Sequence, residues 1–274
     1  MTGKNEPEGV IPQHQPNAGG TPAKDDNQNY VMHHRQPTAF ERSIKLDYNT
    51  ETDDILLTRQ NTLRKLVGIL GMALPLLLYL VLLIDAGFVS PLYSISHYYF
   101  TRASGVFIII VSLLGFFLLI YKGKEPVDFY VSSIAGLFAL SLLLFPTNNI
   151  SDLCQDKDNI CSLTILRVSE FRKNFHYISA AIFLTSLAYM SIFLFTKSDK
   201  PKAERGMNKR RRNRIYRTTG VIMLLAILVI LSNFLGIISD KVFKEFHLTF
   251  WMETIAVESF GFSWLVKAEV FLKG

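Results

Sequence analysis

Apolar and polar positions follow one another in long blocks along this chain. From residue 66 onward, six apolar runs of 17 to 24 residues are separated by polar segments. About 17 to 25 apolar residues of helix cross a hydrocarbon core. Because a backbone in hydrocarbon must satisfy its own hydrogen bonds, the pattern predicts an all-α, polytopic bundle of six transmembrane helices. The predicted spans are 66–84, 103–121, 129–145, 175–195, 219–238 and 248–271.

The first 65 residues lack these apolar runs. Residues 1–50 are rich in Pro, Asn, Gln and Gly and poor in aliphatic residues, so we expect a disordered polar tail. Residues 51–65 carry acidic residues early and basic residues late, which suits a helix dipole, and Thr52 or Asp53 can cap the start. We therefore predict a short cytoplasmic helix at 51–65 and a transmembrane domain over 66–272.

Composition and charge agree with a membrane protein. The chain is 49% hydrophobic and 19% charged, and its mean hydropathy is positive. Ten of the basic residues lie at 197–217, between the fourth and fifth spans. Short basic loops stay in the cytoplasm, so an even number of spans places both termini there. This loop is explained by topology and by contact with anionic lipid, so we expect no nucleic-acid partner and a plasma-membrane location, the inner membrane in a bacterium.

The last predicted span carries Glu253, Glu258 and Lys267, with Glu269 at its inner end. A carboxylate within hydrocarbon is costly, so it marks a candidate site by default. The two glutamates are five positions apart, which is about 140° around a helix, so both cannot point at one pocket. We assign Glu253 to a pocket and Glu258 to a buried polar contact between helices. Trp264 lies near the inner end of the span, where we expect an interfacial anchor.

The predicted topology places three histidines, His97, His176 and His247, at the outer ends of spans. Hydroxyl and aromatic residues surround the first of them. An aromatic belt at the membrane interface is the alternative explanation for the tyrosines. The second interpretation is that the histidines and their polar neighbours line one pocket that opens to the outside. Its candidate members are Ser96, His97, Tyr98, Asn148, His176, Ser179 and Glu253.

The chain has two cysteines, Cys154 and Cys161, in the predicted outer loop after the third span. Two thiols six residues apart on the oxidising side of a membrane favour a disulfide. A zinc pair is less favoured, because the close spacing of a zinc knuckle and a second pair of ligands are both missing.

Three short motifs in order resemble a known family. They are P-x-x-S-I-S-x-Y-Y at 91–99, a histidine opening an apolar run at 176–189, and F-W-x-E at 250–253. Together they resemble the six-span DRAM/FRAG-type membrane proteins and similar uncharacterised bacterial membrane proteins, over residues 64–272. The resemblance implies a polytopic protein that acts at membranes, in some members linked to lipid or lipid-anchor handling. It carries over no catalytic residues.

Three functions fit these observations. The first is an accessory, non-enzymatic membrane protein that binds a lipid or another membrane protein through the outer pocket, without a cofactor. The second is a zinc-dependent intramembrane hydrolase of lipid amides or esters, with His97, His176 and His247 as ligands and Glu253 or Asp152 as base. The third is a small-solute or proton-coupled transporter that uses both glutamates as relay groups.

Overall fold

The computed structural model describes residues 53–87, 89–123, 125–150, 164–198, 201 and 206–272. The predicted tail, Cys154, Cys161 and Asp152 lie outside these residues. The chain divides into two units, 1–51 and 52–274, and every described element belongs to the second. The described residues form helices and no β-strand, so the all-α prediction is confirmed for this part of the chain.

Six long helices build the second unit. They are α2 (Asp53–Ala86), α3 (Ser104–Ile120), α4 (Pro126–Leu144), α5 (Glu170–Tyr189), α6 (Met207–Phe234) and α8 (Leu248–Lys267). Short elements join or extend them: the 3₁₀ helix η1 (Ile95–Phe100), the π-helix η2 (Met190–Leu194) and α7 (Asp240–Glu245). Each of the six apolar runs thus falls largely within one helix, although the first residues of α2 and α6 precede their runs.

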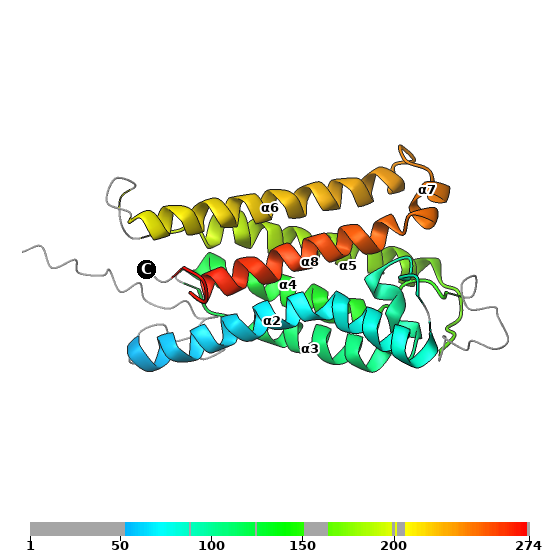
Figure 1. The fold of residues 1–274 in the computed structure, drawn as a ribbon, viewed down its shortest axis with the longest axis horizontal. Coiled ribbons are helices and arrows are strands. Elements are labelled where there is room, and N and C mark those ends of the chain that lie inside the picture. The colour runs from blue at the N-terminus through cyan, green and yellow to red at the C-terminus, as the bar shows by residue number, and fades with distance from the viewer. Residues whose placement is uncertain are drawn as a thin grey trace, which may run out of the picture. The chain divides into compact units, whose positions relative to one another are not determined.

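The six long helices pack as a closed ring. Neighbours in sequence contact one another from α2 to α6, and α8 packs between α6 and α2 to close the ring. In Figure 1, α6, α8 and α2 form the near layer, and α5, α4 and α3 lie behind them. Buried aliphatic and aromatic side chains fill the space between the layers. Because α8 closes the ring, one of its faces points inward and the opposite face points away from the bundle.

Four helices are long and apolar enough to cross a membrane. They are Gln60–Asp85, Pro126–Leu144, Glu170–Leu194 and Met207–Phe234. The two remaining long helices differ from these for simple reasons. Helix α3 is apolar but has only 17 residues, and α8 has 20 residues but carries Glu253, Glu258 and Lys267.

The predicted helix at 51–65 is continuous with the first apolar run. Helix α2 extends over 34 residues, about 51 Å at the usual helical rise, and contains Pro75 in its interior. Only part of this length is needed to cross hydrocarbon. The polar first turns of α2 therefore extend beyond the apolar segment as one rigid element.

Two glycine pairs allow close approach of neighbouring helices. A Cβ atom on Gly261 of α8 would lie 2.8 Å from the carbonyl oxygen of Gly68 on α2 and 2.6 Å from Cγ of Met72. A Cβ atom on Gly136 of α4 would lie 2.5 Å from the carbonyl oxygen of Gly115 on α3. Small residues at such crossings let backbones pack closely. The first pair fixes the rotation of α8, and hence the directions of its two glutamates.

Trp264 is not an interfacial anchor, so that prediction is wrong. Its side chain is fully buried and packs against Tyr121, Phe195 and Phe260, with ring centroids 4.9, 5.2 and 5.8 Å away. Trp264 follows Gly261 by three residues and so lies on the inward face of α8. The aromatic cluster fills the inside of the ring of helices at the end opposite η1. If Trp264 pointed outward as an anchor, this space would be left empty.

Candidate functional site

The candidate site lies where η1, the start of α8 and the α4–α5 connection meet, which we call the η1 end of the bundle (Figure 1). Hydroxyl groups join η1 to the residues on either side of it. The backbone N–H of Leu92 donates to the Tyr98 hydroxyl (3.4 Å), and the Thr101 hydroxyl donates to the Tyr98 carbonyl (2.9 Å). Tyr98 and Thr101 are both fully buried. The hydroxyl and the carbonyl of Tyr98 therefore hold this segment together through hydrogen bonds. Burial raises the pKa of Tyr98 to about 12.

Two hydrogen bonds attach the segment around η1 to α8. The backbone N–H of Phe250 donates to the Tyr93 carbonyl (3.0 Å), and the backbone N–H of Ile95 donates to Oε2 of Glu253 (2.6 Å). Glu253 thus joins two segments that are 158 residues apart in the chain. No described residue forms a hydrogen bond with its second oxygen, Oε1.

A small internal cavity lies beneath η1, inside the ring. Its volume is about 50 Å³, enough for only a few water-sized groups. Of the described residues that line it, Ser96 and Glu253 are the polar ones. The others are apolar: Leu74, Ile95, Phe107, Val111, Leu114, Leu142, Ala180, Phe183, Leu184, Leu187, Val257 and Phe260. The structure therefore brings two of the predicted pocket residues together in one cavity, with a carboxylate as its strongest hydrogen-bond acceptor.

His97 lies on η1, and its contacts with neighbouring side chains do not favour a role as a metal ligand. Its Nδ1 lies 2.6 Å from the Ser94 hydroxyl, and its ring meets the edge of Tyr93 at a centroid distance of 6.1 Å. Burial lowers the pKa of His97 to about 4, and the nearby positive charges of His176 and Lys244 lower it further. His97 is thus neutral at physiological pH.

His176 and Ser179 lie on the first turns of α5, one turn apart, and both are buried. Nδ1 of His176 lies 2.9 Å from the carbonyl oxygen of Phe145, just after α4. No described residue pairs with the Ser179 hydroxyl. His176 therefore satisfies a carbonyl at the end of α4 and stabilises the α4–α5 junction.

His247 caps the start of α8 in a left-handed conformation, with φ 49°. Its ring stacks on Tyr93 at 5.8 Å, and the ammonium of Lys244 lies 5.7 Å from the centre of the same tyrosine ring. Among the described residues, no three His, Cys, Asp or Glu side chains are grouped closely enough to hold a metal ion. His97 and His247 both contact Tyr93, and His176 contacts the Phe145 carbonyl, so the placement of the three histidines does not fit the zinc site considered from sequence.

Asn149, rather than its neighbour Asn148, organises the segment after α4. Its side chain donates to the Leu166 carbonyl (2.7 Å) and accepts from the Leu166 N–H (3.0 Å), which joins the segments after α4 and before α5. Asn148 is partly exposed. Arg172 also ties this region together by donating to the Pro146 and Arg167 carbonyls. Backbone partners of this kind leave no spacing motif in a sequence, which is why Asn149 and Arg172 were not predicted.

Glu258 is not a buried contact between helices, and this corrects the sequence prediction. Its residue is partly exposed, and no hydrogen bond or ion pair joins it to any described residue. Glu253 faces the cavity, and the 140° rotation between the two positions turns Glu258 away from it. The two carboxylates therefore do not form a continuous relay through the bundle.

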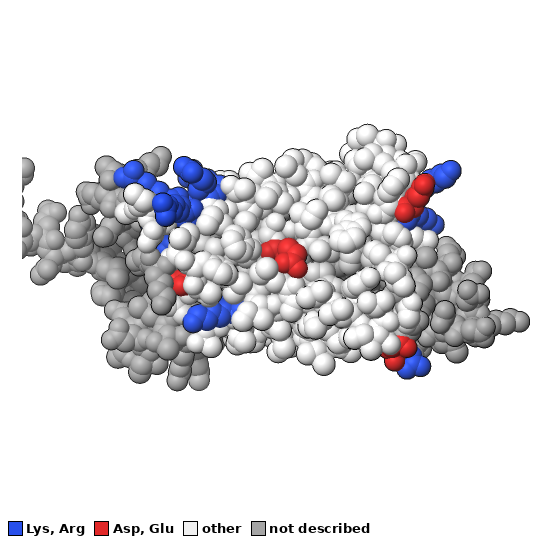
Figure 2. Space-filling view, in the orientation of Figure 1, with Lys and Arg blue, Asp and Glu red and all other residues white. Residues whose placement is uncertain are grey.

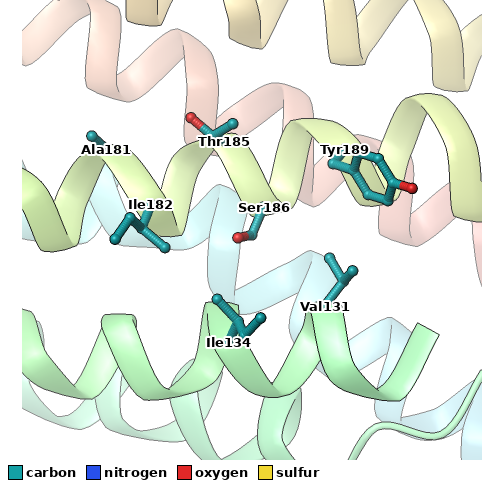
Figure 3. A pocket seen from close by; sticks show the side chains of 7 residues that line it. All are labelled: Val131, Ile134, Ala181, Ile182, Thr185, Ser186 and Tyr189. Carbon is teal, nitrogen blue, oxygen red and sulfur yellow. The ribbon is translucent and has the colours of Figure 1, made fainter. Parts of the chain in front are cut away.

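A larger groove lies on the outside of the bundle between α4 and α5, with a volume of about 410 Å³. In Figure 3, Ile182 and Ser186 on α5 point toward Ile134 and Val131 on α4. Ala181, Thr185 and Tyr189 complete its lining. Such a groove can hold a hydrocarbon chain, but it offers only hydroxyl groups for a polar ligand. The cavity beneath η1, with its carboxylate, is the better candidate for specific recognition.

The described geometry thus concentrates recognition chemistry at Glu253 and Ser96. Comparisons with protein-family models, with curated proteins and with solved structures find no match to this chain. The resemblance to the DRAM/FRAG-type proteins stays a prediction from motifs. Any function must therefore be argued from the site itself.

Proposed function

We propose that this chain is a six-span protein of the plasma membrane, with α2, α3, α4, α5 with η2, α6 and α8 as its spans. Exposed arginines on the first turns of α6 support an orientation with this end in the cytoplasm and the η1 end outside. Figure 2 shows basic side chains gathered near that end of α6 and a largely uncharged surface along the bundle. The same proposal includes kinship with the DRAM/FRAG-type family.

We further propose that the protein is an accessory, non-enzymatic protein that binds a lipid through the cavity beneath η1. One observation carries this proposal: a carboxyl group with one oxygen that bonds no described residue lines an internal cavity, whose other described lining residues, apart from Ser96, are apolar. A carboxylate accepts hydrogen bonds, so the matching ligand bears a donor such as a hydroxyl or an ammonium group. The apolar walls select a ligand whose remaining part is hydrocarbon.

In this proposal, the hydrogen bond from the Ile95 N–H to Glu253 holds η1 against α8 until a ligand replaces it. The cavity of about 50 Å³ is smaller than a lipid, so entry of more than the polar tip requires outward movement of η1. A ligand donor that binds Glu253 replaces the Ile95 N–H and so favours this movement. Ser96, on the same 3₁₀ helix, would leave the cavity wall together with Ile95.

The other two functions have less support in this geometry. The hydrolase needs a zinc site, but among the described residues the three histidines do not form a ligand cluster. The transporter needs a relay between the glutamates, but Glu258 faces away from the cavity that Glu253 lines. Lipid binding requires neither arrangement.

Mass-spectrometric analysis of lipids retained by the purified full-length protein tests the proposal. We expect the wild type to retain a lipid with a donor group at its polar end. Glu253→Leu removes the acceptor for the donor group of the ligand. Such a hydrogen bond contributes about 0.5 to 1.5 kcal/mol, so retention should fall by up to about tenfold. Ser96→Trp fills the cavity and should have the same effect.

Glu258→Gln is the matched control, because it changes a carboxyl group on the same helix that faces away from the cavity. Its lipid retention should equal that of the wild type. Equal retention in wild type and Glu253→Leu would reject the cavity as the lipid site. Equal loss in Glu253→Leu and Glu258→Gln would show that membrane insertion of α8, and no specific site, controls retention.

A further inference from the structure

The outward face of α8 carries a carboxyl group without a partner. Glu258 is partly exposed and forms no hydrogen bond or ion pair with any described residue. Trp251 and Ile255 precede it by seven and three residues, on the same side of the helix, and are 49% and 39% exposed. Figure 2 shows an acidic patch, without a basic neighbour, on the uncharged surface over the middle of α8.

The depth of Glu258 makes this exposure costly. It is the eleventh of the 20 residues of α8, so about 15 Å of helix lies on either side of it. A span of this length places residue 258 near the centre of a hydrocarbon core of about 30 Å. Even a protonated carboxyl needs one acceptor and one donor, and lipid tails supply neither. A lipid-facing carboxyl at this depth therefore indicates a polar partner within the membrane.

The charges of this chain favour one kind of partner. The apolar parts of its six long helices, at 66–84, 104–120, 129–144, 178–194, 218–234 and 248–266, contain no Lys, Arg or His. A second copy in the same orientation therefore offers no basic partner within these ranges, but it places its own Glu258 at the same depth. Two protonated carboxyl groups satisfy each other, because each O–H donates to the carbonyl oxygen of the other. A two-fold axis normal to the membrane creates this reciprocal contact.

We propose that the outward face of α8 is a homodimer interface within the membrane, in which Glu258 pairs with Glu258 of a second copy. Trp251 and Ile255 supply apolar contacts beside the pair. Helix α8 lies in one layer with α2 and α6, and no described element covers its outward face (Figure 1). The proposal rests on the membrane placement of α8 in the proposed function, but not on the lipid cavity.

Single-molecule photobleaching of the full-length protein in liposomes, over a range of protein-to-lipid ratios, tests this interface. The wild type should show two-step bleaching that increases with protein density. Glu258→Leu should raise the dissociation constant about tenfold, the scale expected for a hydrogen-bonded pair in a membrane. Glu258→Gln should keep the dimer, because two side-chain amides also pair reciprocally. Glu253→Gln, on the opposite side of α8, should leave dimerisation unchanged.

Leucine at position 258 suits a lipid-facing helix, so Glu258→Leu should fold, and circular dichroism with thermal unfolding checks this. A wild type that stays monomeric at every density overturns the proposal. A dimer of equal stability in Glu258→Leu also overturns it, since another face must then be used. A monomer that instead purifies with another membrane protein bearing a basic transmembrane residue overturns it as well. Lipid retention measured on the same samples separates failure of this interface from failure of the lipid site.

Discussion

Two carboxyl groups on α8 occupy opposite environments although only five residues separate them. Glu253 faces inward, accepts a hydrogen bond from Ile95 at 2.6 Å and lines a cavity with Ser96. Glu258 faces outward and has no partner among the described residues. The inward group is explained by contacts within the chain, and the outward group is not. A rotation of 140° around one helix is thus enough to give two carboxyl groups different environments.

The largest expected effect comes from removing the inward group. Glu253→Leu leaves the Ile95 N–H without its acceptor and separates η1 from α8. An unsatisfied buried donor costs about 1 to 3 kcal/mol, so we expect a loss of this size in the free energy of unfolding. Thermal unfolding in detergent measures it. Glu253→Gln keeps an acceptor oxygen and should lose less than half as much, whereas equal losses would mean that the Ile95 bond is unimportant.

Changing the rotation of α8 should disturb both surfaces together. Gly261→Ala places a methyl group 2.8 Å from the Gly68 carbonyl oxygen, which is too close for an ordinary contact. Overpacking of this kind costs about 1 to 3 kcal/mol. Gly105→Ala on α3 is the control, because no described atom lies within 4 Å of its added methyl group. Equal thermal stability of the two variants would contradict the close α2–α8 packing.

Acid should weaken the η1 end through His97. Its pKa is about 4 in the folded protein and about 6.5 in an unfolded chain, so the unfolded state binds more protons between these values. The free energy of unfolding should therefore fall as the pH drops from 6.5 to 4 and change little more below 4. His97→Gln should remove up to about 3 kcal/mol of this dependence. A wild-type profile that matches the variant would contradict the burial of His97.

The smallest effect should come from the outward group. Glu258→Leu removes a carboxyl that contacts no described residue, so the thermal stability of the monomer should change by less than about 0.5 kcal/mol or increase. The measurement is made in detergent at a concentration where the wild type is monomeric. A loss of thermal stability as large as that of Glu253→Leu would contradict the difference between the two sides of α8.

The sequence predicted the helices better than their contacts. Runs of apolar residues determine where a membrane helix forms, so each of the six runs falls largely within one long helix. The predicted pocket was only partly assembled, because Ser96 and Glu253 share a cavity while His176 binds the Phe145 carbonyl. Trp264 was misplaced because the rotation of α8 depends on Gly68 and Gly261, a tertiary contact that apolar periodicity does not encode.

The central claim is that the cavity beneath η1 binds the polar end of a lipid. The most direct test is photo-crosslinking in liposomes with a lipid that carries a diazirine beside a hydroxyl or amine headgroup, followed by peptide mapping. We expect adducts on Ile95, Ser96 or Val257 that Glu253→Leu abolishes and Glu258→Gln preserves. Adducts confined to the α4–α5 groove, at Ile134 or Ile182, and equal in all three proteins would contradict it.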